Sequence, residues 1–151
     1  MYEVLIWLTV WYLVMAFSEY FIHKYTMHKR TLLPEWIWRH HAIEHHKNNR
    51  NDLNVDLPFY MHLIVGSPLL TFAYFGYGLV SMLCLLLIFY FHSYTWTHVH
   101  RAIHGLEDHW ITKTNYYKRA QKHHLDHHKR PAKNFGVVFL WTDHLFKTKY
   151  E

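Results

Sequence analysis

The chain has 151 residues, of which 51% are hydrophobic and 17 are histidine, and its formal net charge is +5. This length predicts one domain, residues 1–151. The single cysteine, Cys84, excludes an intramolecular disulfide and argues against a thiolate metal site. No nucleic-acid-binding motif is present, so we assign the basic charge to the surface of a membrane with anionic lipids and expect no nucleic-acid partner.

The first predicted element is an apolar run at 4–22, interrupted only by Glu19 near its end. It lacks the basic start and the small-residue cleavage site of a signal peptide. Its length approaches the roughly 20 residues that cross a bilayer as a helix. We therefore expect the run to be a membrane span.

A polar, histidine-rich segment follows this span. Thr31 and Pro34 indicate the start of a helix, because proline is favoured in the first helical turn. The residues EWIWRHHAIEHH predict a short helix at the membrane interface, with its tryptophans at the level of the lipid headgroups. The polar stretch 48–56 is expected to be a loop.

A long uncharged stretch comes next. Residues 57–100 contain no Lys, Arg, Asp or Glu, and a Gly-Tyr-Gly sequence at 76–78 divides them into apolar runs at 58–75 and 79–98. Each run approaches the length of a membrane-spanning helix. The pattern predicts a helical hairpin with a glycine-rich tip.

The last predicted helix carries the HHLDHH sequence. Asn115 is a candidate for its N-terminal cap, and Pro131 opposes continuation beyond about Arg130. All 16 Lys and Arg residues follow the first span, and none lies in the hairpin tip. Three crossings therefore place the N-terminus and the tip on one side and every basic residue on the other, which the positive-inside rule makes cytosolic.

The predicted fold class is accordingly all-α. We expect an integral membrane protein with about three transmembrane helices and a His-rich helical cap, formed by residues 23–56 and 99–151, on the cytosolic face. The membrane is either the bacterial inner membrane or the endoplasmic reticulum.

The spacing of the histidines can be tested against helix geometry. Residues three or four apart share one face of an α-helix. Three sets have this spacing: His41 with His45, His100 with His104, and His124 with His127 and His128. His23 and His28 are five apart, so both reach one centre only if the helix ends or is locally rewound near Tyr25.

These histidine clusters all fall on the predicted basic side, close to the membrane edge. Imidazole binds Fe, Zn, Cu and Ni well, and about ten converging rings exceed the ligands of one tetrahedral ion, which implies two metal ions. A structural zinc site usually contains Cys, and a two-zinc hydrolase would include more carboxylates. Iron held mainly by histidine beside lipid indicates dioxygen activation and attack on an unactivated C–H bond.

Polar residues near the clusters are expected to orient the ligating rings through hydrogen bonds. Glu19 lies one turn before His23 and is expected to accept its free ring N–H. The other candidates for such a role are Asp126, Asn134 and Asp143. For Asp126, a solvated position at the surface without this role is an equal alternative. Packing or polar helix contacts are expected for His62 and His92 inside the hairpin, and a structural role for His144.

The sequences EYFIHKYTMH, HAIEHH, HVHRAIH and HHLDHH, followed by NFG and WTDHLFKT, resemble the membrane fatty acid hydroxylase and sterol desaturase superfamily, which includes beta-carotene hydroxylases. The resemblance extends from Glu19 to Thr148. It implies a non-haem di-iron centre held by histidine motifs on the cytosolic face of a helical membrane domain. The metal ligands carried over by motif are His23, His28, His41, His45, His46, His100, His104, His124, His127 and His128.

Departures from the superfamily pattern leave alternatives open. The second motif is HxxxHH, one residue longer than the common form, so His40 is an alternative to His41. Three further alternates adjoin the motifs: His98, His109 and His123. FKT replaces the usual FGT, and a single span precedes the first motif where relatives usually have more.

The resemblance implies a di-iron enzyme that hydroxylates, or desaturates, a long-chain lipid with dioxygen as co-substrate. A fatty-acyl or sphingolipid chain is the preferred substrate and a carotenoid ring the alternative, and zinc is a possible substitute for the two irons in a preparation. We expect a separate electron donor, a ferredoxin or small haem protein with its reductase. A non-enzymatic metal transporter or sensor is the alternative of another class, although a transporter would place its ligands near the bilayer midplane.

Overall fold

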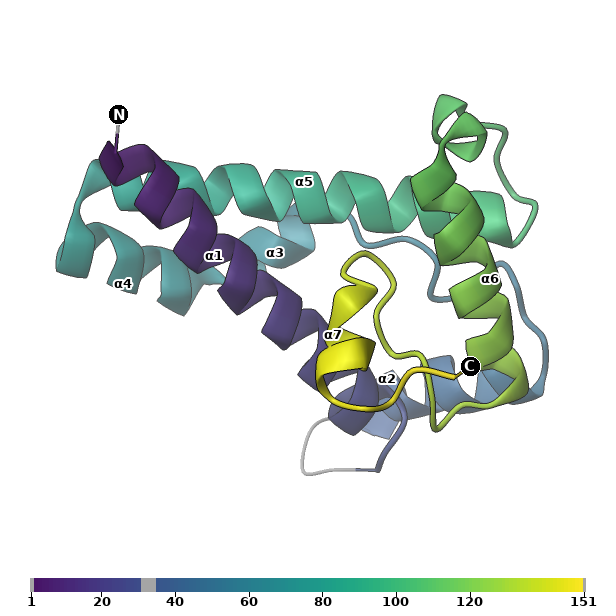
Figure 1. The fold of residues 1–151 in the computed structure, drawn as a ribbon. Helices are drawn as coiled ribbons and strands as arrows, with labels where there is room; N and C mark the ends of the chain where they lie inside the picture. Colours follow the sequence, from purple (N-terminus) through teal and green to yellow (C-terminus); the bar gives the residue numbers. More distant parts are fainter. Residues whose placement is uncertain (1, 31–34, 151) are drawn as a thin grey trace.

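The computed structural model describes residues 2–30 and 35–150, and every regular element within them is helical (Figure 1). The elements are α1 (Tyr2–Phe21), the π-helix η1 (Ile22–Met27), α2 (Glu35–Trp38), the π-helix η2 (Arg39–Lys47), α3 (Phe59–Val65), α4 (Ser67–Tyr77), α5 (Leu79–Ile103), the 3-10 helix η3 (Trp110–Lys113), α6 (Asn115–Lys129) and α7 (Trp141–Leu145). The all-α prediction is confirmed. The predicted helix start at Thr31 and Pro34 lies outside the described residues.

The apolar helices are suited to a membrane. Two of them, Tyr2–Met27 and Leu79–Ile103, are long and apolar enough to cross a bilayer, and α3 with α4 forms a third span if the bent pair is counted as one. Large apolar side chains on these helices face outward, as Phe75 does with 82% of its surface exposed. Lipid contact removes the cost that such exposure would have in water.

The first arm of the predicted hairpin is not one continuous helix, because α3 and α4 meet at an angle of 67°. Pro68 has no N–H to donate to the carbonyl of Ile64, and the hydroxyl of Ser67 donates to that carbonyl instead (2.9 Å). Gly66 is needed at the bend, since a Cβ there would lie 2.5 Å from the ring of Phe89. The bend thus has a local cause in the Gly-Ser-Pro sequence.

The two long helices α1 and α5 pack against each other and form most of the core (Figure 1). Trp11 and Ala16 of α1 are buried with Leu85 of α5. The N-terminal end of α1 meets the hairpin tip, where the rings of Trp7 and Tyr77 are 4.6 Å apart. The N-terminus and the tip therefore lie at the same end of the molecule, as predicted, and the His-rich cap lies at the other.

The cap is held on the end of α5 by a second core. Val99 and Ile103 of α5 pack with Ala120 of α6. The N-terminal capping residue of α6 is Thr114, whose hydroxyl accepts from the backbone N–H of Tyr117 (3.1 Å). The prediction of Asn115 as this residue was therefore wrong by one position. The helix ends before Pro131 as predicted.

Candidate metal centre

Two π-helices bring histidines five residues apart onto one face. Tyr25 lies within η1, so the predicted local rewinding of the first helix is confirmed. The backbone N–H of His28 donates to the carbonyl of His23 (3.2 Å), which is the bonding pattern of a π-helix. η2 does the same for His41 and His46, whose ring nitrogens lie 3.2 Å apart.

The structure gathers ten histidines into two compact groups. Within each group, one ring nitrogen of every member lies within 4.8 Å of the others. Group 1 contains His23, His28, His41, His46 and His127, and group 2 contains His45, His100, His104, His124 and His128. These are the ten residues that the sequence motifs singled out, and they come from η1, the residue after η1, η2, α5, the residue after α5, and α6.

Neighbouring residues are divided between the groups. His41 shares a group with His46, not with His45 as α-helical spacing predicted, because η2 is a π-helix. The three histidines of α6 that were predicted to share one face are also divided. His127 belongs to group 1, and His124 and His128 belong to group 2. The rings of His46 and His128 stack with centroids 4.1 Å apart, so the two groups share a wall.

Hydrogen bonds to carbonyl groups fix the tautomers in group 1. A carbonyl oxygen only accepts, so Nδ1 of His23 donates to Phe135 and Nδ1 of His127 donates to Lys133 (2.6 Å). A neutral imidazole then carries a lone pair on Nε2. Both lone pairs point at Nε2 of His28, which lies 3.2 Å from Nε2 of His23 and 2.9 Å from Nε2 of His127. This nitrogen of His28 can donate at most one proton, so it cannot satisfy both. A cation at the common centre satisfies all of these nitrogens.

The distances agree with coordination of one ion. Two nitrogens bound at about 2.1 Å and at a right angle lie about 3.0 Å apart. In group 1, Nε2 of His41 is 2.8 Å from that of His23 and 3.2 Å from that of His28. In group 2, Nε2 of His124 is 3.1 Å from that of His104 and 3.0 Å from that of His128.

Group 2 also contains buried nitrogens that have no hydrogen-bond partner among the described residues. Both ring nitrogens of His100 and Nε2 of His45 are in this state. Leaving a buried polar atom unpaired costs about 1–3 kcal/mol, so such a cluster needs an occupant. The residues of both groups therefore fit a metal ion.

Burial keeps these imidazoles neutral. It lowers the pKa of His104 to about 4 and, together with nearby imidazoles, the pKa of His128 to about 3. Burial followed by neighbouring rings also holds the pKa of His41 and His124 well below the ordinary value. Neutral imidazole is the form that binds a metal ion.

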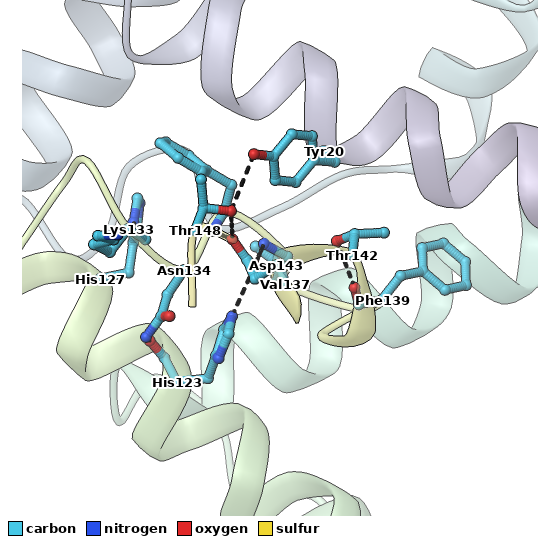
Figure 2. A network of polar contacts seen from close by, with 12 residues as sticks. Tyr20, His123, His127, Lys133, Asn134, Val137, Phe139, Thr142, Asp143 and Thr148 are labelled. Atoms are coloured by element: carbon cyan, nitrogen blue, oxygen red, sulfur yellow. Dashed lines mark hydrogen bonds and ion pairs between the residues drawn. The ribbon is translucent and has the colours of Figure 1, made fainter. Parts of the chain in front are cut away.

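Asp143 fixes the segment that orients group 1. Figure 2 shows His123 pointing from α6 toward Asp143, and Thr148 linking Asp143 to Tyr20. The carboxylate also accepts from the backbone N–H of Phe135 and Gly136. Burial opposes its charge, but these hydrogen bonds outweigh burial and lower its pKa. Asp143 thus supports His23 through the Phe135 carbonyl, and the alternate ligand His123 is occupied as its partner.

Glu19 does not accept from His23, and that prediction was wrong. Its Oε2 accepts from Nε2 of His92 (2.6 Å), and its Oε1 accepts from the backbone N–H groups of Val137, Val138 and Phe139. Nδ1 of His92 lies 2.9 Å from Nε2 of His62. His62 and His92 therefore make polar contacts between helices, as expected.

The remaining candidates belong to neither of the two groups. His40 is exposed, and Asp126 pairs with Lys122 (2.7 Å) at the surface. The side chain of Asn134 donates to the carbonyl of His123 and accepts from the backbone of Tyr150, which is a structural role. His144 is also exposed.

His98 and His109 form a third histidine group with Glu107, but its geometry does not suit a metal. The two rings are nearly parallel, with an interplanar angle of 12° and centroids 4.3 Å apart. Nitrogen lone pairs lie in the ring plane, so those of stacked rings do not converge on one ion. Glu107 is instead bonded to His98 (2.6 Å) and Arg101 (3.2 Å).

The sequence patterns did not indicate the groups that orient the rings from outside the motifs. The carbonyls of Phe135 and Lys133 carry no side-chain signature of this role. The NFG sequence that contains Phe135 was the only local signal.

A model of the fatty acid hydroxylase family matches residues 8–148, which include all ten histidines. Neither the curated proteins nor the solved structures contain a match to this chain.

Proposed function

The chain belongs to the fatty acid hydroxylase family, and on this premise we propose that it is an integral membrane oxygenase that hydroxylates a long-chain lipid with two iron ions, dioxygen and external electrons. The observation that carries the proposal is the convergence of ten histidines into two adjacent groups. Family membership supports a membrane lipid hydroxylase, and the histidine groups support a metal-dependent one.

The protein side chains hold and shield the metals. When bound, two iron ions supply the redox chemistry with dioxygen that breaks a C–H bond, which no side chain can perform. His41, His45, His100 and His127 are fully buried, so bulk water does not reach these rings. Glu19 and Asp143 are the buried carboxyl side chains among the described residues, and Asp143 supports the ring of His23 through the Phe135 carbonyl.

The substrate we propose is a fatty-acyl or sphingolipid chain, which reaches the metals from the membrane. The two groups lie where α5 leaves the apolar hairpin and η1 continues α1 directly. Electrons would come from a separate ferredoxin or small haem protein that docks on the basic end of the molecule. That end carries all Lys and Arg residues of the chain.

The test uses the purified full chain, loaded with Fe(II) without oxygen and then given a reductant, labelled dioxygen and a lipid. We expect two irons per chain and one labelled oxygen atom in the product, measured by mass spectrometry. Expression in hosts that make sphingolipids or carotenoids distinguishes the two substrate classes. A chain that holds two irons, receives electrons and oxidises none of these lipids would contradict the proposal.

A further inference from the structure

A groove of about 740 Å³ lies outside both histidine groups. Its lining residues come from α6, from α1 and α7, and from the segments before and after α7. None of the ten clustered histidines lines it. The volume is typical of sites that bind small organic ligands, about 300–1,000 Å³.

Helix geometry separates this groove from group 2 of the histidines. The α6 residues in its wall, from Tyr116 through Arg119 and Lys122 to Asp126, fall within an arc of about 120° at 3.6 residues per turn. His124 and His128 of group 2 lie about 140–180° from Arg119 on the same helix, whereas His127 of group 1 lies about 80° from it. A ligand in the groove is therefore on the opposite side of α6 from group 2, and His127 lies beside the groove without lining it.

The charged residues of the groove are mostly cationic. Arg119, Lys122 and Lys149 line it with one carboxylate, Asp126. Asp126 accepts from Lys122 (2.7 Å), which leaves Arg119 and Lys149, both exposed, to face a ligand. A guanidinium group and an ammonium group that line the same groove favour a phosphate, which can accept from both.

The other wall of the groove is apolar and reaches into the membrane-spanning part. Tyr12 is nine residues before the end of α1, which corresponds to about 14 Å along the helix. The indole N–H of Trp141 donates to its hydroxyl (3.0 Å), so these two side chains form a joined aromatic surface. Val138 and Leu140 extend it toward the cationic residues.

We propose that this groove binds an anionic phospholipid, with the phosphate between Arg119 and Lys149 and the upper part of an acyl chain against Tyr12 and Trp141. A soluble phosphate ligand would make no use of the apolar wall, and a zwitterionic lipid such as phosphatidylcholine would bring its quaternary ammonium group next to the two cations, which repel it. The site is independent of the proposed hydroxylation, since it uses neither the histidine groups nor their metals.

The test measures thermal unfolding of the purified full chain in a neutral detergent, with phosphatidylglycerol, phosphatidylcholine or inorganic phosphate added. We expect phosphatidylglycerol to raise Tm by about 3 °C, because a ligand that binds only the folded state stabilises it. Phosphatidylcholine and inorganic phosphate should leave Tm within error. Native mass spectrometry should show one retained phosphatidylglycerol per chain.

Two double variants with the same charge change separate a built site from general attraction. Arg119→Gln/Lys149→Gln should lose the rise in Tm and the retained lipid. Lys113→Gln/Lys118→Gln, at exposed positions outside the groove, should keep both. If the first double variant does not fold, the single variant Arg119→Gln replaces it and should lose at least half of the rise in Tm with phosphatidylglycerol. Equal loss in the two double variants, or an equal rise with inorganic phosphate, would overturn the proposal.

Discussion

Glu19 Oε2 lies 2.6 Å from His92 Nε2, and the two side chains are only 1% and 2% exposed. The pair joins the two long helices α1 and α5 inside the apolar part of the molecule. The second oxygen of Glu19 accepts three backbone N–H groups at 137–139, so one carboxylate ties both helices to the segment that leads to α7. Removing one partner of a buried charged network is costly because the other groups remain buried without a partner.

Replacing this carboxylate should therefore lower stability far more than replacing a surface one. We expect Glu19→Gln to reduce the free energy of unfolding by about 3 kcal/mol. Asp52→Asn, which breaks an exposed ion pair with Arg50, should leave the unfolding temperature nearly unchanged, because water and salt screen such a pair. Thermal unfolding of both variants in detergent checks this. If the two variants unfold at the same temperature, Glu19 does not stabilise the fold in this way.

Asp143 should affect metal binding through the 135–136 backbone. Asp143→Asn loses an acceptor for His123 or for a backbone N–H, so we expect a loss of about 2 kcal/mol in stability and roughly 10-fold in metal affinity. Thr148→Val removes only the hydroxyl that donates to Asp143, and should cost about 1 kcal/mol with unchanged affinity. Calorimetric titration with Co(II) measures the affinity. Equal affinities for the two variants would show that Asp143 does not support the metal centre.

The sequence was most informative where a signal was local. The motifs of the family resemblance contain all ten clustered histidines, and the five-residue separation of His23 and His28 predicted that the helix ends or is rewound near Tyr25, where a π-helix is observed. The partner of Glu19 was missed because residues 137–139 are about 120 positions away along the chain, and nothing near Glu19 indicates them. The division of His45 from His46 depends on which ring meets α5, which is a tertiary contact.

That division gives a direct test of the two groups. His45→Ala and His46→Ala change adjacent residues but should each remove one of two metal ions per chain, from different groups. The double variant should retain neither. His40→Ala, at an exposed position on the same segment, should keep both. Metal analysis after loading with Fe(II) or Co(II) gives the counts, and full occupancy of His46→Ala would remove His46 from the ligand set.

Acid should destabilise the metal-free protein through these same imidazoles. The ordinary pKa of histidine is 6.5, and burial lowers that of His104 to about 4 and that of His128 to about 3. Below pH 6.5 the unfolded chain therefore binds protons that the folded chain does not, and stability falls as the pH drops from about 6.5 toward 4.

We expect Tm of the metal-free chain to fall steadily across this range. His104→Gln/His128→Gln should show a shallower fall, since these two positions no longer take up protons on unfolding. Loss of bound metal should occur in the same range, because protons compete with the ion for the ring nitrogens. A Tm that stays constant between pH 7 and pH 4, or that falls equally in the double variant, would show that buried neutral histidines do not set the acid stability.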